Sequence, residues 1–355
     1  MTDVLIAGGG TGGHLFPGIA LAQEVKRRDP SSRILFVGTA RGIEVRAVPK
    51  AGFDLALLKV SGLKRTGVVG LVAGLFRLPL ALVNAIGVVH RFKPQVAVSV
   101  GGYAAGPAVL AARILGVPCV VMEQNAVPGL TNRILAKVAT KVVASMPATA
   151  LQGDKILVLG NPVRSDLLPV RDSAYAPQSP LRLFIFGGSQ GARAVNEAFM
   201  KIASRLKDLG VTIRHQTGEA DVARVKGAYE EVGFTGVNVS AFIDDMATAY
   251  KDADLIICRA GATSIAELTV CGRPSILVPF PGATDDHQTA NAKALEITGA
   301  AIHIAQGADL ADRLWDVIAA LTAERLITMA KAARETGRPL AASAIADTLD
   351  GVRRV

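Results

Sequence analysis

Two short segments of this chain share one pattern, and that pattern restricts the fold more than any other feature of the sequence. "LIAGGGTGGH", beginning at Leu5, and "FIFGGSQGAR", beginning at Phe184, each give an apolar strand, a double glycine and a further glycine that opens a helix. A glycine turn between a parallel strand and its helix is typical of the first unit of a doubly wound domain. The sequence therefore predicts an α/β fold with two Rossmann-like parallel-sheet domains that face each other across a cleft.

Short β-branched runs alternate with amphipathic stretches along the whole chain, which is the pattern of a parallel sheet covered by helices. The 355 residues suffice for two domains of about 100–200 residues each. In the first half we expect strands near Val4–Ala7, Ile34–Val37, Leu55–Lys59, Val96–Val100, Cys119–Met122, Lys141–Ala144 and Ile156–Leu159. In the second half we expect them at "LRLFIF" and near Val211–His215, Val237–Ala241, Leu255–Cys258, Ser275–Val278 and Ala301–Ile304.

A segment rich in proline, serine and aspartate, "NPVRSDLLPVRDSAYAPQSP", follows Gly160 and is expected to link the two domains. We place the first domain at residues 1–162 and the second at residues 163–339. The final stretch, at about residues 340–355, is expected to form a helix that packs back on the first domain.

The positive charge of the chain is concentrated in its first half. The formal net charge is +9, but residues 1–160 hold 18 Lys and Arg against 7 Asp and Glu, whereas residues 161–355 hold 21 against 23. No acidic residue occurs between Asp54 and Glu123. This asymmetry predicts an anionic partner for the first half, and the candidates are nucleic acid, anionic lipid and a phosphorylated substrate.

The first glycine turn also spells the dinucleotide fingerprint G-x-G-x-x-G at Gly8, Gly10 and Gly13. A dinucleotide site needs a carboxylate about 20 residues later, after the second strand, to bind the ribose hydroxyls. No carboxylate occurs from Arg33 to Gly42, although Arg41 could face an NADP phosphate. An NADP-dependent oxidoreductase is therefore a disfavoured alternative.

The first glycine turn combines an anion site with a histidine. Bare backbone amides at the start of a helix bind anions with no side chain in the way. His14 stands in the first turn of the helix that follows. A lone histidine is more often structural than catalytic, but a position at a glycine turn between two domains favours a functional role.

Seven motifs occur along nearly the whole chain, namely "GGGTGGHLFPGIALA", "SVGGYAAGP", "EQNAVPGLTNRILA", "GNPVR", "GGSQGAR", "FIDDM" and "RAGATSIAELTVCGRPSILVPFP…DDHQTANA". In this order they resemble the MurG family of bacterial peptidoglycan glycosyltransferases (family 28). The resemblance implies a GT-B fold and an inverting transfer of N-acetylglucosamine from UDP-GlcNAc to the 4-hydroxyl of undecaprenyl-diphospho-MurNAc-pentapeptide (lipid I). The products are lipid II and UDP, in the synthesis of the cell wall on which cell shape and division depend. Another GT-B glycosyltransferase acting on a lipid acceptor is an alternative.

The resemblance assigns the UDP-sugar to the second domain. It implies that Ala262, Thr263 and Ser264 lie at a helix N-terminus beneath the UDP diphosphate, where the helix dipole stabilises the charge of the leaving group. Glu267, one turn further along that helix, would bind the ribose hydroxyls. The other donor contacts that it implies are Ser189 on the phosphate side, Ile243 at the uracil with Arg164 close by, Gln288 at the sugar hydroxyls, and Asn125 with Thr11, Gly12 and Gly13 from the first domain.

The resemblance assigns the acceptor to the first domain. The lipid diphosphate would be bound at the two glycine turns that follow strands, by Gly9, Gly10, Gly101, Gly102 and Tyr103. His14 is the candidate general base that removes the proton from the acceptor 4-hydroxyl, and Glu123 is a weaker candidate. The chain departs from the family pattern at Ala105, where serine is common, and at Met122, where histidine is frequent.

The segment Val68–His90 is apolar enough to suggest a membrane-spanning helix, but Arg77, Pro79 and Asn84 interrupt it. A patch that lies on an anionic lipid surface fits better. We expect this patch to be formed by Leu75, Phe76, Leu78 and Leu80, with Lys64 and Arg65 beside them. The expected location is peripheral, on the cytoplasmic face of the bacterial inner (plasma) membrane.

No metal or other cofactor is expected to be required. "DAD" at Asp252–Asp254 resembles the D-x-D of metal-dependent transferases, but it precedes a strand. It should therefore lie at the amino edge of the sheet, away from the ligand edge, as a surface turn. A Mg²⁺ ion bridging the diphosphate is compatible with the reaction, but nothing in the sequence indicates one. Asp244 and Asp245 are expected to cap the helix that follows them.

A nucleic-acid-binding protein is also disfavoured. Recognition of single strands needs aromatic platforms among the cations, and only 5% of this chain is aromatic. No helix-turn-helix, zinc or RRM signature appears in the sequence. The expected partners are UDP-GlcNAc, lipid I, an anionic membrane surface and other proteins of cell-wall synthesis, and no nucleic acid.

Overall fold

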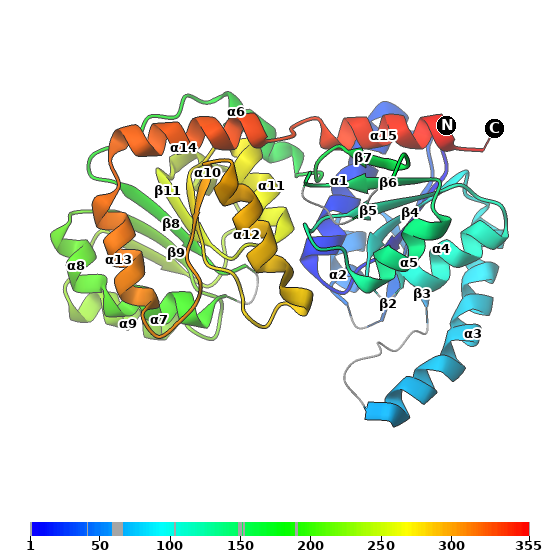
Figure 1. Ribbon diagram of the computed structural model, residues 1–355, viewed down its shortest axis with the longest axis horizontal. Helices are drawn as coiled ribbons and strands as arrows, with labels where there is room; N and C mark the ends of the chain where they lie inside the picture. Colours follow the sequence, from blue (N-terminus) through cyan, green and yellow to red (C-terminus); the bar gives the residue numbers. More distant parts are fainter. Residues whose placement is uncertain are drawn as a thin grey trace. The chain divides into compact units, whose positions relative to one another are not determined.

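The computed structural model describes residues 2–40, 42–58, 67–102, 104–147, 151, 153–188 and 191–354, with the backbone alone at residues 67–78. The chain divides into two compact units, each an α/β unit built on a parallel sheet (Figure 1). The first unit comprises Met1–Arg164 and Leu340–Val355, and the second comprises Ser165–Pro339. The units meet in sequence after Arg164, whereas the expected boundary followed residue 162.

Apolar strands build the sheet of the first unit, and its central strands are buried because helices cover both faces of a parallel sheet. Among the described residues, this sheet has seven strands in the order β3-β2-β1-β4-β5-β6-β7. They are β1 (Val4–Gly8), β2 (Ile34–Thr39), β3 (Asp54–Leu58), β4 (Val96–Gly101), β5 (Cys119–Glu123), β6 (Lys141–Ala144) and β7 (Ile156–Val158). Each of them overlaps a strand that the sequence predicted.

Helices cover both faces of this first sheet. They are α1 (Gly12–Arg28), α2 (Glu44–Lys50), α3 (Gly67–Phe92), α4 (Ala105–Ile114), α5 (Leu130–Val138) and α15 (Ala341–Val352). Consecutive strand residues point to opposite faces. Ile6 accordingly joins a core with Val48 of α2 and Ile345 of α15, whereas Leu5 joins a core with Val109 of α4.

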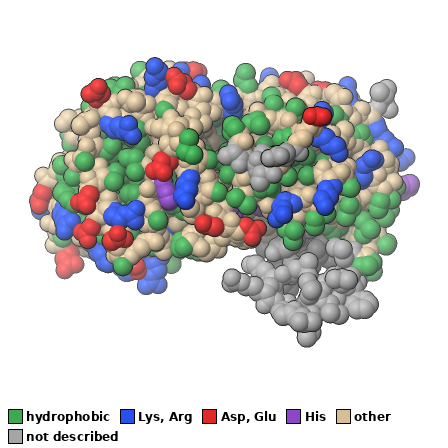
Figure 2. Space-filling view, in the orientation of Figure 1, with side chains coloured by type: hydrophobic (Ala, Val, Ile, Leu, Met, Phe, Trp, Pro, Cys, Tyr) green, Lys and Arg blue, Asp and Glu red, His purple; other side chains and the backbone are tan. Residues whose placement is uncertain are grey.

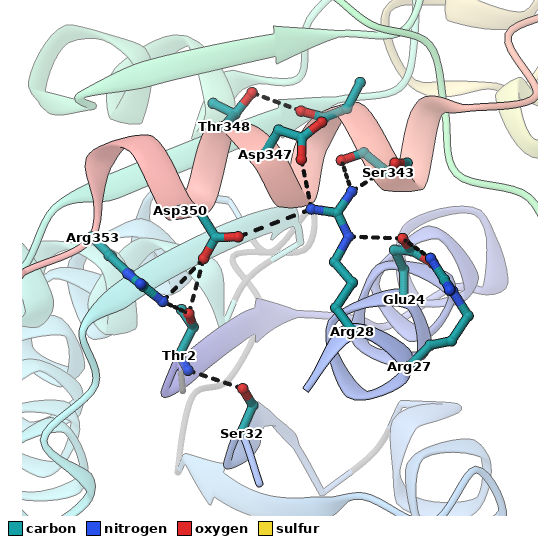
Figure 3. A network of polar contacts seen from close by, with 11 residues as sticks. Thr2, Glu24, Arg27, Arg28, Ser32, Ser343, Asp347, Thr348, Asp350 and Arg353 are labelled. Carbon is teal, nitrogen blue, oxygen red and sulfur yellow. Dashed lines mark hydrogen bonds and ion pairs between the residues drawn. The ribbon is translucent and has the colours of Figure 1, made fainter. Parts of the chain in front are cut away.

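The last helix, α15, lies against α1 in the first unit. Its Ile345 is fully buried in the core. Around this apolar contact, Arg28 donates to Asp347 at 2.6 Å and Thr2 donates to Asp350 at 2.9 Å (Figure 3). Thr2, Arg28 and Asp350 also line a cavity of about 220 Å³. Exposed ion pairs add little to stability, so most of the attachment of α15 comes from its buried apolar side chains.

The second unit repeats the architecture of the first. In the part of it that the structure describes, six parallel strands pair in the order β10-β9-β8-β11-β12-β13. They are β8 (Arg182–Phe186), β9 (Thr212–Gln216), β10 (Val237–Ser240), β11 (Leu255–Cys258), β12 (Ser275–Leu277) and β13 (Ala301–His303).

Helices also surround the second sheet. They are α6 (Leu168–Asp172), α7 (Arg193–Lys201), α8 (Ala203–Asp208), α9 (Val222–Glu231), α10 (Met246–Asp252), α11 (Ala262–Cys271), α12 (His287–Ile297), α13 (Leu310–Ala320) and α14 (Ala323–Thr336), with 3₁₀ turns at Ser165–Leu167 and Thr284–Asp286. Ile185 of β8 packs in a core with Phe199 of α7. On the opposite face of β8, Phe184 and Phe186 contact the ring of Tyr250 in α10.

Both sheets place a glycine turn at the point where the strand order reverses. This point lies between β1 and β4 in the first sheet and between β8 and β11 in the second. Ligands of doubly wound domains bind beyond the carboxyl ends of the strands at such a switch point. The glycine turns after Gly8 and after Phe186 stand at these two places. The predicted doubly wound α/β architecture is confirmed.

Within the described part of the chain, no helix combines the length and the apolar character needed to cross a membrane.

Candidate active site

The two glycine turns of the first unit pack backbone against backbone. Gly8, Gly9 and Gly10 all have positive φ, at 141°, 142° and 87°, and so do Gly101 and Gly102 after β4. The Gly9 amide donates to the Gly101 carbonyl at 3.2 Å. A side chain at Gly8 would overlap the Gly101 carbonyl, and one at Gly102 would overlap the Gly9 carbonyl. Glycine is needed here both for the left-handed backbone and for this close approach.

A buried carboxylate accepts hydrogen bonds from the glycine turn that follows β1 and from the end of β2. Glu44, at the start of α2, is 1% exposed, and its Oε2 accepts from the Gly10 amide at 2.8 Å. Its Oε1 accepts from the amide of Thr39 at 2.9 Å and from the Thr39 hydroxyl at 3.0 Å. Burial by itself would raise the pKa of the Glu44 carboxyl, but the amides of Gly10 and Thr39 outweigh it and lower that pKa.

These contacts involve part of the predicted acceptor site. The amides of Gly9 and Gly10 donate to Gly101 and Glu44, and the Gly101 amide donates to Ser99 at 3.3 Å. Three amides that were assigned to the acceptor diphosphate are therefore used inside the protein. Gly102 lies half-buried beside Gly9, and Tyr103 lies outside the described residues.

Glu44 is the first carboxylate after β2, but it lies beyond the end of that strand, at the start of α2. It binds the glycine turn itself. Its carboxyl carbon would lie 2.7 Å from a Cβ added at Gly9, so the carboxylate is turned onto the glycine turn. Glu44 therefore stabilises the first glycine turn through its hydrogen bond with the Gly10 amide.

His14 occupies the first turn of α1, half-buried, and a glutamine fixes its ring. Its Nδ1 lies 3.2 Å from Oε1 of Gln124. The Gln124 amide donates from Nε2 to the Val100 carbonyl at 3.3 Å, which keeps Oε1 turned toward the histidine. An acceptor at Nδ1 selects the tautomer with its proton on Nδ1 and its lone pair on Nε2. The ring is therefore held in the form that a general base needs.

Glu123 is enclosed by donors of its own turn and of α5. It is 1% exposed at the end of β5, and its oxygens accept from the amides of Asn125 at 2.9 Å and Gly129 at 3.2 Å. The side chain of Asn132 donates to it at 2.9 Å. The carboxylate thus shapes the turn from residue 123 to residue 129, and its burial keeps it away from a substrate hydroxyl. Its assignment as the weaker candidate base stays a prediction, and this burial disfavours it.

The remaining first-unit residues of the predicted donor site lie around the start of α1 and after β5. Thr11 precedes α1, and its carbonyl accepts from the amides of His14 and Leu15. Gly12 and Gly13 open the helix, where Gly12 lies against the Phe16 ring. Asn125 is half-buried in the turn that Glu123 shapes, and Arg164 is half-buried at the end of the first unit. The two family departures, Ala105 and Met122, are both buried.

In the second unit, the helix α11 begins at the switch point after β11. Gly261 precedes it in extended conformation, and its carbonyl accepts from the Ile265 amide. Ala262 is buried, whereas Thr263 and Ser264 are half-buried in the first turn. The N-terminus of a helix of this length concentrates backbone amides and positive dipole charge, which suits a diphosphate.

Glu267 lies one turn further along α11, and a buried tyrosine donates a hydrogen bond to its carboxylate. It is 9% exposed, and its Oε2 accepts from the hydroxyl of Tyr250 at 2.9 Å. Sequence reasoning missed Tyr250, because no local pattern links α10 to α11. The sequence offers one signal for it, which is a tyrosine in the helix before "RAGATSIAEL".

A glutamine ties the second glycine turn to the loop that contains Ile243. Gln216, buried at the end of β9, accepts from the Gly187 amide at 3.3 Å. It donates to the carbonyls of Gly188 at 3.0 Å and Ala241 at 2.9 Å. Ile243 follows in that loop, half-buried. Sequence reasoning did not identify Gln216, and the predicted ligand Ser189 lies outside the described residues.

Gln288 and the residues before it form a further corner of the second unit. Its Oε1 accepts from the Phe280 amide at 2.9 Å, and the guanidinium of Arg259 lies 5.5 Å from the centre of the Phe280 ring. Asp285 and Asp286, just before α12, have positive φ of 52° and 49°. Left-handed aspartates in succession are a costly conformation, and such strain concentrates at functional sites.

The acidic residues that resembled a metal motif have other roles. Asp254 was expected in a surface turn, but it is fully buried, and Arg182 donates to it at 2.7 Å and 3.0 Å at the amino edge of the sheet. Asp245 caps α10 as expected, by accepting from the Thr248 amide at 2.9 Å. Across the described ranges, no cluster of three or more His, Cys, Asp or Glu could hold a metal ion.

The predicted membrane patch lies mostly outside the described side chains. Leu75, Phe76 and Leu78 have backbone only, and Lys64 and Arg65 are not described. Leu80 is 63% exposed. Further exposed apolar side chains, missed in the sequence, belong to the adjacent helices α3, α4 and α5, namely Val83, Ile114, Leu130, Ile134 and Val138. Figure 2 shows hydrophobic and basic side chains intermixed over the part of the surface that Figure 1 labels α4 and α5.

Comparison with known proteins identifies the family. The chain matches the Glycosyltransferase family 28 N-terminal domain over residues 4–144 and the Glycosyltransferase family 28 C-terminal domain over residues 182–345. It is 46% identical over 353 residues to the UDP-N-acetylglucosamine--N-acetylmuramyl-(pentapeptide) pyrophosphoryl-undecaprenol N-acetylglucosamine transferase of Myxococcus xanthus (strain DK1622), covering 98% of this chain and 92% of that protein. A protein of the same name from Nitratidesulfovibrio vulgaris (strain DSM 19637 / Miyazaki F) is 44% identical over 373 residues, covering 99% and 97%.

A solved structure agrees with this relationship. The crystal structure of Acinetobacter baumannii MurG is 31% identical in sequence and matches with a TM-score of 0.81, covering 99% of this chain and 100% of that one. Similarity of this kind extends over both units and both glycine turns. The chain therefore belongs to the MurG family of GT-B glycosyltransferases, within glycosyltransferase family 28.

Proposed function

We propose that this protein transfers N-acetylglucosamine from UDP-GlcNAc to the 4-hydroxyl of lipid I, with inversion at the anomeric carbon, and releases lipid II and UDP. The names of its relatives from Myxococcus xanthus and Nitratidesulfovibrio vulgaris support the donor and the acceptor. The observation that carries the proposal is the arrangement on α11, where a helix N-terminus precedes the inward-held carboxylate of Glu267.

The second unit would bind the donor. The amides and hydroxyls of the first turn of α11, with Thr263 and Ser264, would bind the UDP diphosphate. Glu267 would accept hydrogen bonds from the ribose hydroxyls, and Ile243 would present its backbone to uracil. Gln288, Asn125, Arg164 and the start of α1 remain proposed contacts of the donor.

The first unit would bind the acceptor and remove its proton. In the reaction the 4-hydroxyl oxygen bonds to the anomeric carbon while the bond from that carbon to the UDP oxygen breaks. The electron pair of that bond leaves with UDP, where the dipole of α11 stabilises the added negative charge. The hydroxyl proton passes to Nε2 of His14, because the contact with Gln124 places the lone pair of the neutral ring there.

The leaving diphosphate needs compensation of its charge, and the chain can supply it without a metal. The positive end of α11 and the amides in its first turn are fixed before the reaction. Preorganised donors of this kind stabilise a developing anion without reorganisation. We therefore propose that no metal cofactor is required.

The exposed apolar side chains of α3, α4 and α5 support attachment to a membrane surface. On α5 they stand at Leu130, Ile134 and Val138, one turn apart, and Arg133 and Lys137 lie between them in sequence. Apolar side chains that enter the interface beside basic groups suit an anionic membrane. We propose that the protein works as a peripheral enzyme on the cytoplasmic face of the plasma membrane, where it meets its lipid acceptor and other proteins of cell-wall synthesis.

Calorimetric titration of the full-length protein with UDP-GlcNAc, UDP-glucose and NADPH tests this proposal. We expect UDP-GlcNAc to bind, with UDP-glucose binding at least about tenfold more weakly because it lacks the N-acetyl group. NADPH should give no heat, since the Glu44 carboxylate already binds the Gly10 amide and would repel a dinucleotide diphosphate at this glycine turn. Binding of NADPH without binding of either UDP-sugar would overturn the proposed donor site.

A further inference from the structure

A buried tyrosine stands directly behind the carboxylate that we assign to the donor ribose. The hydroxyl of Tyr250 lies 2.9 Å from Oε2 of Glu267. Tyr250 is fully buried, and Glu267 is 9% exposed. Burial, followed by the nearby Glu267 charge, raises the pKa of Tyr250 well above its ordinary value. The hydroxyl therefore keeps its proton and acts as the donor to the carboxylate.

The position of this hydroxyl is fixed from several sides. The Tyr250 ring meets the rings of Phe184 and Phe186 edge-on, at 6.0 Å and 6.1 Å between centroids. The Tyr250 carbonyl accepts from Nε of the buried Arg273 at 2.7 Å. Packing of this density leaves the tyrosine one orientation, so its hydroxyl presents a fixed donor to Glu267.

The same hydrogen bond joins two segments with different proposed tasks. Tyr250 belongs to α10, which begins at Met246 directly after the loop containing Ile243, the proposed uracil contact. Glu267 belongs to α11, whose N-terminus is the proposed diphosphate site. The hydrogen bond from Tyr250 to Glu267 therefore connects α10, which follows the proposed uracil contact, to α11, which would bind the ribose and the diphosphate.

We propose that Tyr250 is a positioning residue of the donor site, which orients the Glu267 carboxylate for the ribose hydroxyls. This inference rests on the proposed function, because it needs Glu267 to bind the ribose. A carboxylate held by a buried donor binds a diol without first losing side-chain freedom, so the gain appears in affinity for the ribose. The chemistry at the anomeric carbon is not altered by Tyr250.

The test is the affinity of the full-length native and Tyr250→Phe proteins for UDP and for its 2′,3′-dideoxy analogue, measured by calorimetry. Tyr250→Phe removes only the hydroxyl and keeps the packed ring. We expect it to weaken UDP binding about fivefold, which is the cost of ordering a Glu267 side chain that the hydroxyl no longer holds, and to change binding of the dideoxy analogue less than twofold.

A matched control comes from the same unit. Tyr229 is a buried tyrosine whose hydroxyl lies 3.1 Å from Nδ1 of His215, away from α11. Tyr229→Phe should lower stability as much as Tyr250→Phe does and leave the affinity for both ligands unchanged. A loss of UDP affinity in Tyr229→Phe equal to that in Tyr250→Phe would show a general loosening of the unit and overturn the inference.

A second pair of variants keeps the inference testable if Tyr250→Phe proves unstable. Because Tyr250 acts through Glu267, adding Tyr250→Phe to Glu267→Ala should cause no further loss of UDP affinity. An equal additional loss, or equal weakening of UDP and of the dideoxy analogue in Tyr250→Phe, would overturn the positioning role alone. If the native protein binds both ligands equally, the ribose role of Glu267 fails, and the proposed donor site fails with it.

Discussion

Oε2 of Glu44 accepts a hydrogen bond from the Gly10 amide at 2.8 Å, so a carboxylate of the first unit occupies its own glycine turn. The second unit holds its turn with a neutral side chain, as Gln216 bonds to Gly187 and Gly188. Glu44 opens the helix α2 that follows β2, and Gln216 is the last residue of β9, so each side chain comes from the βα unit of the strand next to the one that precedes the turn. Each glycine turn is therefore fixed in one conformation by a side chain from an adjacent βα unit.

Glu44→Gln should destabilise the protein. The amide that replaces one oxygen would face the N–H group of Gly10 or Thr39, and a buried donor would lose its partner. We expect the free energy of unfolding to fall by about 2 kcal/mol, measured by urea unfolding followed by circular dichroism. The control is Glu335→Gln, at a side chain that is 67% exposed. A loss no greater than that of the control would show that Glu44 does not brace the turn.

The contribution of Glu44 should depend on pH in one direction. Its pKa is lowered from 4.5 in the folded protein, so the stabilisation is fully present above pH 4.5 and disappears as pH falls through the folded value. The difference in unfolding free energy between the native protein and Glu44→Gln should stay constant from about pH 7 to pH 5.5 and shrink below that range. A difference that grows in acid would contradict this sign.

His14→Ala should separate chemistry from donor binding. Loss of a general base lowers kcat by about 100-fold or more, whereas the UDP contacts on α11 do not involve this ring. Gln124→Ala should lower kcat less, by about tenfold, since it frees the tautomer and orientation of His14 but keeps the base. Steady-state kinetics with UDP-GlcNAc titrations provide both numbers. A fall in donor affinity as large as the fall in kcat would place His14 in the donor site instead.

Removal of divalent metal should leave the transfer rate unchanged. The leaving diphosphate is expected to rest on the amides and the dipole of α11, and these do not depend on an ion. The measurement compares the initial rate after dialysis against EDTA with the rate after Mg²⁺ is restored. A loss of more than about tenfold that Mg²⁺ reverses would mean that the ion shares the diphosphate site.

Membrane attachment should weaken when the exposed stripe of α5 becomes polar. Leu130 and Ile134 are 66% and 52% exposed, so changing both to Ser should lower binding to anionic vesicles about tenfold. The melting temperature should not change, because neither side chain lies in the core. Ile297→Ser with Ile327→Ser, at exposed positions in the second unit, is the matched control. Equal effects of the two pairs would argue against a defined membrane surface.

The sequence predicted the strands and both glycine turns because these features depend on neighbouring residues. Apolar strands and glycine turns repeat over short windows, so each strand was found near its expected position. Glu44 was not predicted because it lies beyond Gly42, outside the stretch in which a ribose-binding carboxylate is expected. Tyr250 and Gln216 were not predicted because their hydrogen-bond partners lie on other elements. Only the folded chain brings such donors and acceptors together.

Burial was the property that local patterns predicted least well. A surface position is expected for Asp254 because short acidic turns are usually solvated. In the structure Asp254 is fully buried, and its carboxylate accepts a hydrogen bond from Arg182. Glu123 was weighed as a base because few acids occur in the first half of the chain. In the structure it is enclosed by the amides of its own turn. A buried carboxylate is recognised by its donors, and these donors are not visible in a sequence window.

The measurement that tests the central claim most directly is transfer from UDP-GlcNAc to purified lipid I by the full-length protein, with the product examined by mass spectrometry and NMR. The account predicts one added N-acetylglucosamine in β linkage at the 4-position of the MurNAc residue, together with one UDP released per product. It further predicts that the His14→Ala protein forms this product at least about 100-fold more slowly while still binding the donor. An α-linked product, or release of UDP that does not require lipid I, would contradict the account.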